Sequence, residues 1–175
     1  IGFQTAPYMP DEAAGAVMIE LAEIPVRQNA EAEETPSDQE TEEKAAVARA
    51  HGCDEIINYS HEDVAKRARE LTDGVGVNVV FDSVGKSTFM ASLDSLKRRG
   101  LLVCVGTASG PIDAFNPQLL AMKGSLYLTR PALADYIADP AEKAALAEEI
   151  FGHVAAGRIR IEINQHYALA DAVQA

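Results

Sequence analysis

The feature that most constrains the fold is the stretch VNVVFDSVGKSTFMASLDSLKRRGLLVCVG, residues 77–106. It opens on a β-branched run, 77–82, that is typical of a buried strand. A helical segment follows over 86–100, with basic residues in its last turn and a glycine at its end. Residues 101–106 are again apolar. A strand, a helix and a second strand in this order favour a βαβ unit with parallel strands, as in nucleotide-binding sheets.

The chain continues this alternation on both sides of that unit. We expect further helices over 42–52, from Ser60 (with Asp63 as a capping box) to about Thr72, from Pro140 to Gly157, and from 168 onward. Further strands are expected over 55–59, 125–129 and 158–163. The sequence therefore predicts one α/β domain over residues 41–175, with a mostly parallel sheet and flanking helices.

The N-terminal quarter of the chain differs in charge. Residues 1–43 hold eleven acidic residues and one basic residue, whereas the remainder holds sixteen and fourteen, within a net charge of −12. Residues 28–44 have almost no apolar side chain larger than alanine, so most of this segment is predicted to be a mobile linker. Residues 13–26 suit either a strand or a short buried helix. We therefore treat 1–40 as a divergent acidic leader or linker.

Composition excludes several classes of function. The near-neutral body has no basic patch for nucleic acid, and no apolar run approaches the ~20 residues that cross a bilayer. The two cysteines, Cys53 and Cys104, lie far apart and outside any C-x-x-C pair, which favours reduced thiols and a cytoplasmic protein. The four histidines are scattered, with no spacing suited to a catalytic triad or a metal site: His51, His61, His153 and His166.

Several strings together resemble one known family. EEKAAVARAHGCDEIINY, VVFDSVG, SLKRRGLLVCVGTASG, KGSLYLTRP and AAGRIRIEI, all within about 41–175, are similar to NADPH:quinone oxidoreductases of the zeta-crystallin-like, zinc-free branch of the medium-chain dehydrogenase/reductase superfamily. The resemblance implies a Rossmann-like NADPH-binding domain and hydride transfer to a quinone or another small electrophilic acceptor. It also implies a homodimer joined through the edge strand near Ser125–Thr129.

The opening βα unit of that family is incomplete here. Family members carry a Gly-Gly-Val-Gly type turn whose backbone N–H groups meet the cofactor pyrophosphate. In that place this chain has VMIELAEIPVRQNAEAEETPSDQ, without a glycine. By comparison with the family, we expect the preceding substrate domain to be missing, unrecognisable or a remnant within 1–40. We likewise expect the closing segment to be missing or unrecognisable, and the nucleotide domain to be truncated at its C-terminus.

The resemblance assigns cofactor contacts residue by residue. Lys44 and Tyr59 fall where the family contacts the adenosine 2′-phosphate, and Thr41 adds a hydroxyl there; the alternative is a solvated helix lysine and a strand-end tyrosine. Ser83 and Val84 follow a strand and would lie along the ribose and adenine. The GTASG segment would lie beside the nicotinamide, although the same residues also suit an ordinary loop: Gly106, Thr107, Ala108, Ser109 and Gly110. Asp82 is read as a strand-end or turn-capping residue.

Three functional readings remain open. The first is an NADPH-dependent quinone reductase, or the cofactor-binding part of one, without a catalytic side chain, because hydride transfer needs mainly alignment and exclusion of water. The second is a non-catalytic or dimerising remnant with weak or no NADPH binding, favoured by the absent glycine turn. An NADPH-sensing module is the third.

Overall fold

The computed structural model describes residues 38–59, 61–161, 163 and 166–173. The chain divides after Pro131 into two compact units. The described part of the first runs from residue 38 to residue 131, and that of the second from Ala132 to residue 173. All the buried residues lie in the first unit, between Ile57 and Leu126.

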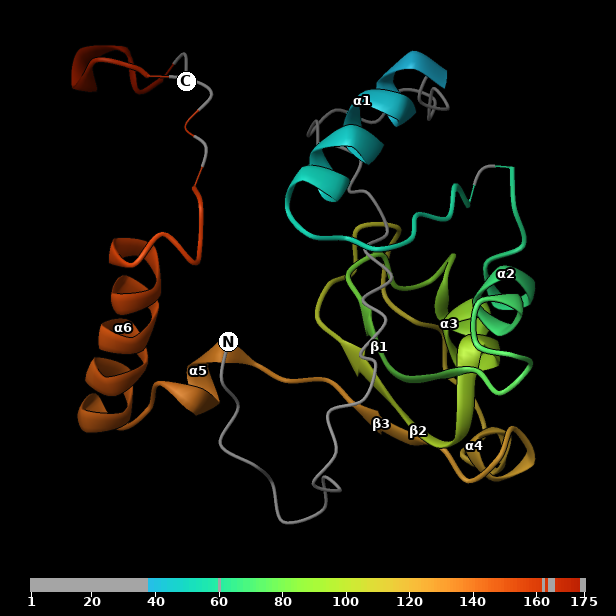
Figure 1. Cartoon of the computed structure of the whole chain (residues 1–175). Coiled ribbons are helices and arrows are strands. Elements are labelled where there is room, and N and C mark those ends of the chain that lie inside the picture. The colour runs from blue at the N-terminus through green and yellow to red at the C-terminus, as the bar shows by residue number, and fades with distance from the viewer. Residues whose placement is uncertain (1–37, 60, 162, 164–165, 174–175) are drawn as a thin grey trace. The chain divides into compact units, whose positions relative to one another are not determined.

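The first unit is built on a three-stranded sheet of order β1-β2-β3 (Figure 1). Its strands are β1 (Val77–Asp82), β2 (Leu96–Cys104) and β3 (Tyr127–Thr129), and both strand pairs are parallel. A bulge interrupts the first pair, since Val77 pairs with Leu96 and Val79 with Leu101. The predicted parallel α/β arrangement is thereby confirmed.

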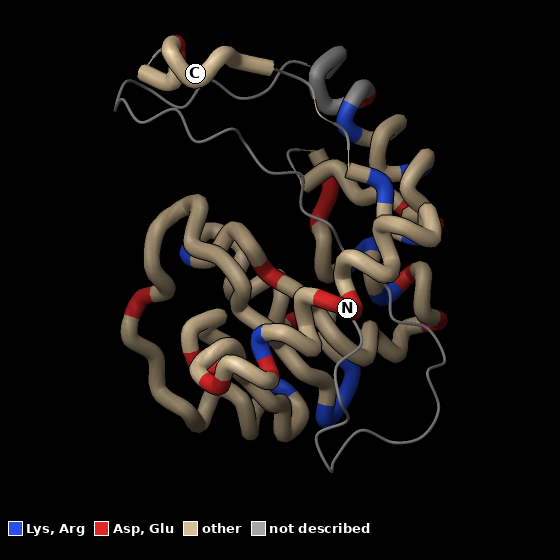
Figure 2. The backbone as a smooth tube through the Cα atoms, turned by 90° about the vertical axis from the view of Figure 1, so that its left-hand side faces the viewer, with Lys and Arg blue, Asp and Glu red and all other residues tan. Residues whose placement is uncertain are grey.

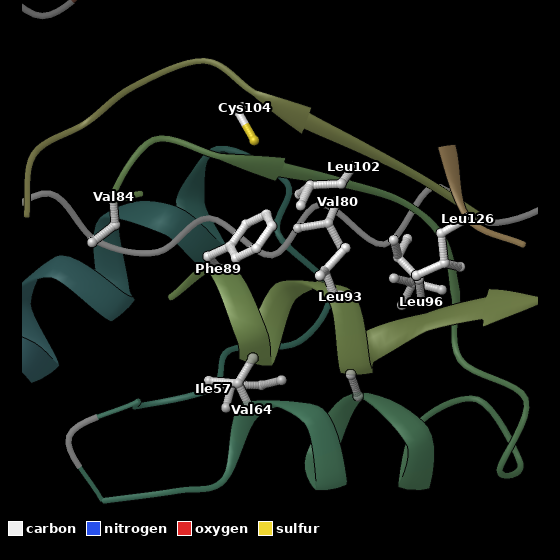
Figure 3. Packing of buried hydrophobic residues seen from close by; sticks show 12 residues of the cluster. Ile57, Val64, Val80, Val84, Phe89, Leu93, Leu96, Leu102, Cys104 and Leu126 are labelled. Atoms are coloured by element: carbon white, nitrogen blue, oxygen red, sulfur yellow. The ribbon is translucent and has the colours of Figure 1, made fainter. Parts of the chain in front are cut away.

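Helices precede, connect and cover these strands. They are α1 (Asp38–Ala50), α2 (Val64–Glu70), α3 (Phe89–Ser95) and α4 (Gln118–Met122). Helix α3 connects β1 to β2, and Figure 3 shows that it lies between the sheet and α2. Helix α4 lies in the connection from β2 to β3. These connections are the crossovers that parallel strands require.

The core fills the space on the two sides of α3. Phe89 and Leu93 point from α3 toward Val80 and Leu102 of the sheet, while Ile57 and Val64 lie on the side of α2 (Figure 3). Leu93 and Leu102 are 1% and 0% exposed. Burial of this apolar surface is the main contribution that stabilises the unit.

Three sequence predictions in this unit need correction. The helix expected over 86–100 ends at Ser95, because Leu96 is buried and pairs with Val77 in the sheet. The strand expected over 55–59 is not formed: these residues lie outside any strand, and only Ile57 among them is buried. The N-cap of α2 is Asp63, whose carboxylate accepts from Lys66 N, and Ser60 lies outside the described residues.

The second unit contains α5 (Leu133–Tyr136), α6 (Pro140–Ala155) and the 3₁₀ turn η1 (Leu169–Asp171). Helix α6 has the predicted bounds, with Asp139 as its N-cap and a positive φ at Gly157. The strand expected over 158–163 is wrong for the described residues there, since Ile161 and Ile163 are exposed and form no ladder. The helix expected from 168 is the short η1 turn.

Charged residues of both signs are interspersed along the described backbone (Figure 2). No helix in the described part of the chain is both long enough and apolar enough to span a bilayer. The predicted strand or helix at 13–26 lies outside the described residues, as does most of the linker predicted over 28–44. Residues 38–44, the last of that segment, belong to α1.

Candidate functional site

Two loops meet at the carboxyl edge of the sheet. The first loop, residues 83–88, follows β1, and the second loop, residues 105–110, follows β2. Because Asp82 and Cys104 are paired across the two parallel strands, both loops begin at the same edge. This is the edge at which open α/β sheets bind their ligands.

The buried carboxylate of Asp82 shapes the first loop. One oxygen accepts from Val84 N and Gly85 N, both at 2.9 Å, and the other accepts from the hydroxyl of Ser92 at 2.8 Å. The hydroxyl of Thr88 also donates to this carboxylate, at 2.9 Å. Asp82 is 0% exposed, and these donors take the place of water around its carboxylate. The turn-capping role predicted for Asp82 is confirmed.

Backbone hydrogen bonds join the second loop to the first. Val105 N donates to Asp82 O at 2.8 Å, Ala108 N to Ser83 O at 3.2 Å and Ser109 N to Val84 O at 2.8 Å. From the first loop, Lys86 N donates to Gly110 O at 3.2 Å. The structure thus brings together seven of the ten predicted site residues: Ser83, Val84, Gly106, Thr107, Ala108, Ser109 and Gly110.

Close backbone contact between the loops requires two glycines. A Cβ atom at Gly106 would lie 2.1 Å from the carbonyl oxygen of Ser83. Gly85 has a φ of +90°, and its Cβ would lie 2.8 Å from the carbonyl oxygen of Gly110. Neither position admits a side chain without separating the loops.

An open hollow of about 470 Å³ lies beside the second loop. Apolar side chains line much of it, with the polar side chains of Thr107, Asp113 and Arg130 among them. The Arg130 guanidinium donates to the carbonyl oxygen of Cys104 at 2.9 Å, which fixes the residue after β3 against the end of β2. The lining residues are Cys104, Thr107, Pro111, Ile112, Asp113, Ala114, Phe115, Leu128 and Arg130.

Cys104 is one of the residues that line this hollow and is 1% exposed. Burial raises the pKa of the Cys104 thiol, the negative charge of Asp82 raises it further, and Arg130 lowers it. With its pKa raised, the Cys104 thiol stays protonated at neutral pH. It is therefore weakly nucleophilic, because the thiolate is the nucleophilic form of cysteine.

The remaining three predicted site residues lie on other segments. Thr41 and Lys44 belong to α1, where Lys44 is half-buried. Tyr59 lies in the coil between α1 and α2 and packs against the core. These residues are outside the hydrogen-bonded pair of loops.

The sequence analysis missed two features of the site. Arg130 was read only as part of the family string KGSLYLTRP, and nothing local indicates that its side chain returns to the end of β2. Gly85 carried a usable signal, since a glycine three residues after a strand-end aspartate is typical of a tight turn with positive φ.

The profile of the family described as zinc-binding dehydrogenase matches residues 39–130. The chain belongs to this family. In the described residues, no group of three or more His, Cys, Asp or Glu side chains is arranged to hold a metal ion. The donor set for the zinc of the family's description is therefore not found in this part of the chain.

The similar proteins include quinone oxidoreductases. One from Pseudomonas aeruginosa is 55% identical over 133 residues, which make up 76% of this chain and 41% of that protein. A solved quinone oxidoreductase structure from Pseudomonas syringae pv. tomato superposes with a TM-score of 0.71 at 48% identity, covering 75% of this chain and 41% of the other. One from Escherichia coli, complexed with NADPH, gives 0.67 at 43% identity and covers 69% and 37%.

These comparisons confirm the predicted resemblance and the Rossmann-like fold. This chain spans about 41% of the length of the Pseudomonas aeruginosa relative. The share is similar for the solved structures.

Proposed function

We propose that this chain is the NADPH-binding part of a quinone reductase. One observation carries the proposal: two small-residue loops at the carboxyl ends of neighbouring parallel strands are held together beside an open hollow. Nucleotide cofactors bind α/β sheets at this edge. Membership of the family and similarity to quinone oxidoreductases support the same assignment.

The cofactor would lie across both parts of the proposed site. Lys44 supplies a cation, and Tyr59 and Thr41 supply hydroxyls, for the adenosine 2′-phosphate. Ser83 and Val84 lie along the ribose and adenine. The second loop, with Gly106 and Gly110 among its small residues, lets the nicotinamide approach backbone amides.

When bound, NADPH would supply the hydride that, together with one proton, reduces a quinone to a hydroquinone. The residues of this chain bind and orient the ring, and the proton comes from solvent. The apolar side chains of Ile112, Phe115 and Leu128 line the hollow and exclude water from the reacting face.

A second candidate function is a non-catalytic remnant of the same fold. The observation in its favour is that no glycine occurs between Gly15 and Gly52, where the family's phosphate turn would stand. Each hydrogen bond lost to a charged phosphate costs about 1.5–3 kcal/mol. The isolated chain is therefore expected to bind NADPH weakly and to turn over slowly.

Titration of the purified chain with NADPH and with NADH, followed by nicotinamide fluorescence, tests the proposed function. We expect saturable binding with NADPH preferred about ten-fold, because an ion pair to the 2′-phosphate is worth roughly 1–2 kcal/mol. Lys44→Gln removes the cation and Tyr59→Phe removes the hydroxyl, so each should lower NADPH affinity and leave NADH affinity unchanged.

Lys66→Gln is the matched control, since Lys66 is an exposed lysine of α2 whose side chain pairs with Glu70. Absence of binding at millimolar NADPH would favour the remnant. If Lys44→Gln lowered the affinity for NADPH and NADH equally, Lys44 would not contact the 2′-phosphate.

We further propose that the whole protein forms a homodimer through β3, which pairs with β2 alone in the described sheet. A cytoplasmic location is proposed because both Cys53 and Cys104 are free thiols. No nucleic-acid or membrane partner is proposed.

A further inference from the structure

The hydroxyl of Ser109 lies between the two loops. It donates to the carbonyl oxygen of Val84 at 2.8 Å and accepts from the backbone N–H of Ser87 at 3.0 Å. A serine hydroxyl has one proton, so its only donor is already used within the protein. We propose that Ser109 is a positioning residue, which sets the spacing of the two loops and does not itself donate to the cofactor.

The other hydrogen bonds between the loops are made by backbone atoms and place no demand on the side chain at position 109. The backbone N–H of Ser109 already donates to the carbonyl oxygen of Val84, and its hydroxyl donates to the same oxygen. The hydroxyl also reaches Ser87, two residues before α3. One side chain therefore ties the second loop to the first loop both near its start, at Val84, and near its end, at Ser87.

The Val84 end of this link is itself held in place. Val84 is 7% exposed, and its N–H is held by the buried Asp82 carboxylate. Thr107 and Ala108, by contrast, are exposed. The Ser109 hydroxyl thus links the buried backbone of Val84 to the exposed second loop, beside which the nicotinamide is proposed to lie.

This inference rests on the proposed function, and its test separates the two. NADPH and NADH are titrated into the full chain and into Ser109→Ala, Ser109→Thr and Ser95→Ala, with nicotinamide fluorescence and thermal melting recorded for each. Ser95→Ala is the matched control: its hydroxyl also donates to a carbonyl at 2.8 Å, that of Ala91, but at the opposite end of β2 from the loops.

We expect Ser109→Ala to lower the affinity for both cofactors about five-fold, because the variant loses both hydrogen bonds of the hydroxyl and with them the side-chain link between the loops. The NADPH-to-NADH preference should be unchanged, because the 2′-phosphate contacts lie elsewhere. Ser109→Thr keeps a hydroxyl and should restore affinity. Ser95→Ala should lower the melting temperature without lowering the affinity for either cofactor.

Wild-type affinity in Ser109→Ala overturns the inference while leaving the proposed function intact. Loss of affinity in Ser95→Ala to the same extent also overturns it, since a general loss of stability would then explain the result. No binding by the unmodified chain overturns both. Should Ser109→Ala fail to fold, Ser109→Cys, which keeps the shape with a weaker hydrogen-bonding group, carries the same comparison.

Discussion

At the scale of single residues, Asp82 has the largest structural role in the site. Asp82 is 0% exposed, and its carboxylate accepts hydrogen bonds from two backbone N–H groups and two hydroxyls that water cannot reach. A buried charge is tolerated only when it is satisfied in this way. The shape of the first loop and the N-terminus of α3 therefore depend on one side chain.

Replacing Asp82 by alanine should lower the free energy of unfolding by about 3–5 kcal/mol, because the buried hydroxyls of Thr88 and Ser92 lose their acceptor. Urea unfolding followed by circular dichroism measures the change. Asp113→Ala is the control: Asp113 is exposed and pairs with Lys86, so its loss should cost under about 0.5 kcal/mol. Equal costs for the two variants would contradict the role assigned to Asp82.

At the scale of elements, the position of α2 against the rest of the unit depends on Arg69. Its guanidinium donates to the carbonyl oxygens of Asp94 and Leu96, where α3 passes into β2. It also donates to those of Gly74 and Val75 in the turn before β1. Arginine suits this place because its fixed fork carries five donors.

Arg69→Ala should lower the free energy of unfolding by about 2 kcal/mol, since several carbonyl groups lose a charged donor. Arg69→Lys should recover only part of this, because one ammonium group cannot span both junctions. Arg67→Ala, on the same helix, removes only surface pairs with Glu55 and Glu70 and should cost under about 0.5 kcal/mol. Full recovery in the lysine variant, measured by the urea midpoint, would contradict this account.

Elements could be predicted from sequence where their signal is local. The run 77–82 is β-branched and forms β1, and Pro140 and Gly157 mark the two ends of α6. The end of α3 could not be predicted, because Leu96 to Arg99 has helical propensity and only the distant pairing with Val77 overrides it. The strands expected over 55–59 and 158–163 are not formed in the described residues, because a strand also needs a ladder partner.

The site shows the same division between local and distant determinants. The two loops were predicted because each follows a strand, and the resemblance assigned them to the cofactor. The hollow was not predicted, since it forms only when Arg130 and Leu128 of a later segment return to the end of β2. The proposed link between Lys44, Tyr59 and the loops still depends on the cofactor titration.

At the scale of the whole molecule, the described sheet has an exposed edge at β3. Tyr127 is 50% exposed there, and exposed strand edges pair readily with other chains. We expect the chain to self-associate through this edge, and Tyr127→Lys to shift it toward monomer, because an edge lysine disfavours strand pairing.

Sedimentation velocity at several protein concentrations measures this equilibrium. Tyr136→Lys, also exposed but on α5, is the control and should leave the association unchanged. Association that is unaffected by Tyr127→Lys would exclude β3 as the contact.

Helix α6 has no buried residue, yet it is sixteen residues long. Local features of the sequence favour it: Asp139 accepts from Ala141 N, Pro140 opens the helix, and alanine is frequent within it. Such a segment forms and frays in about a microsecond, whereas a parallel sheet must first close long loops. The helix of residues 140–155 is therefore expected to form faster than the sheet, because its hydrogen bonds and its N-cap join residues that are close in the sequence.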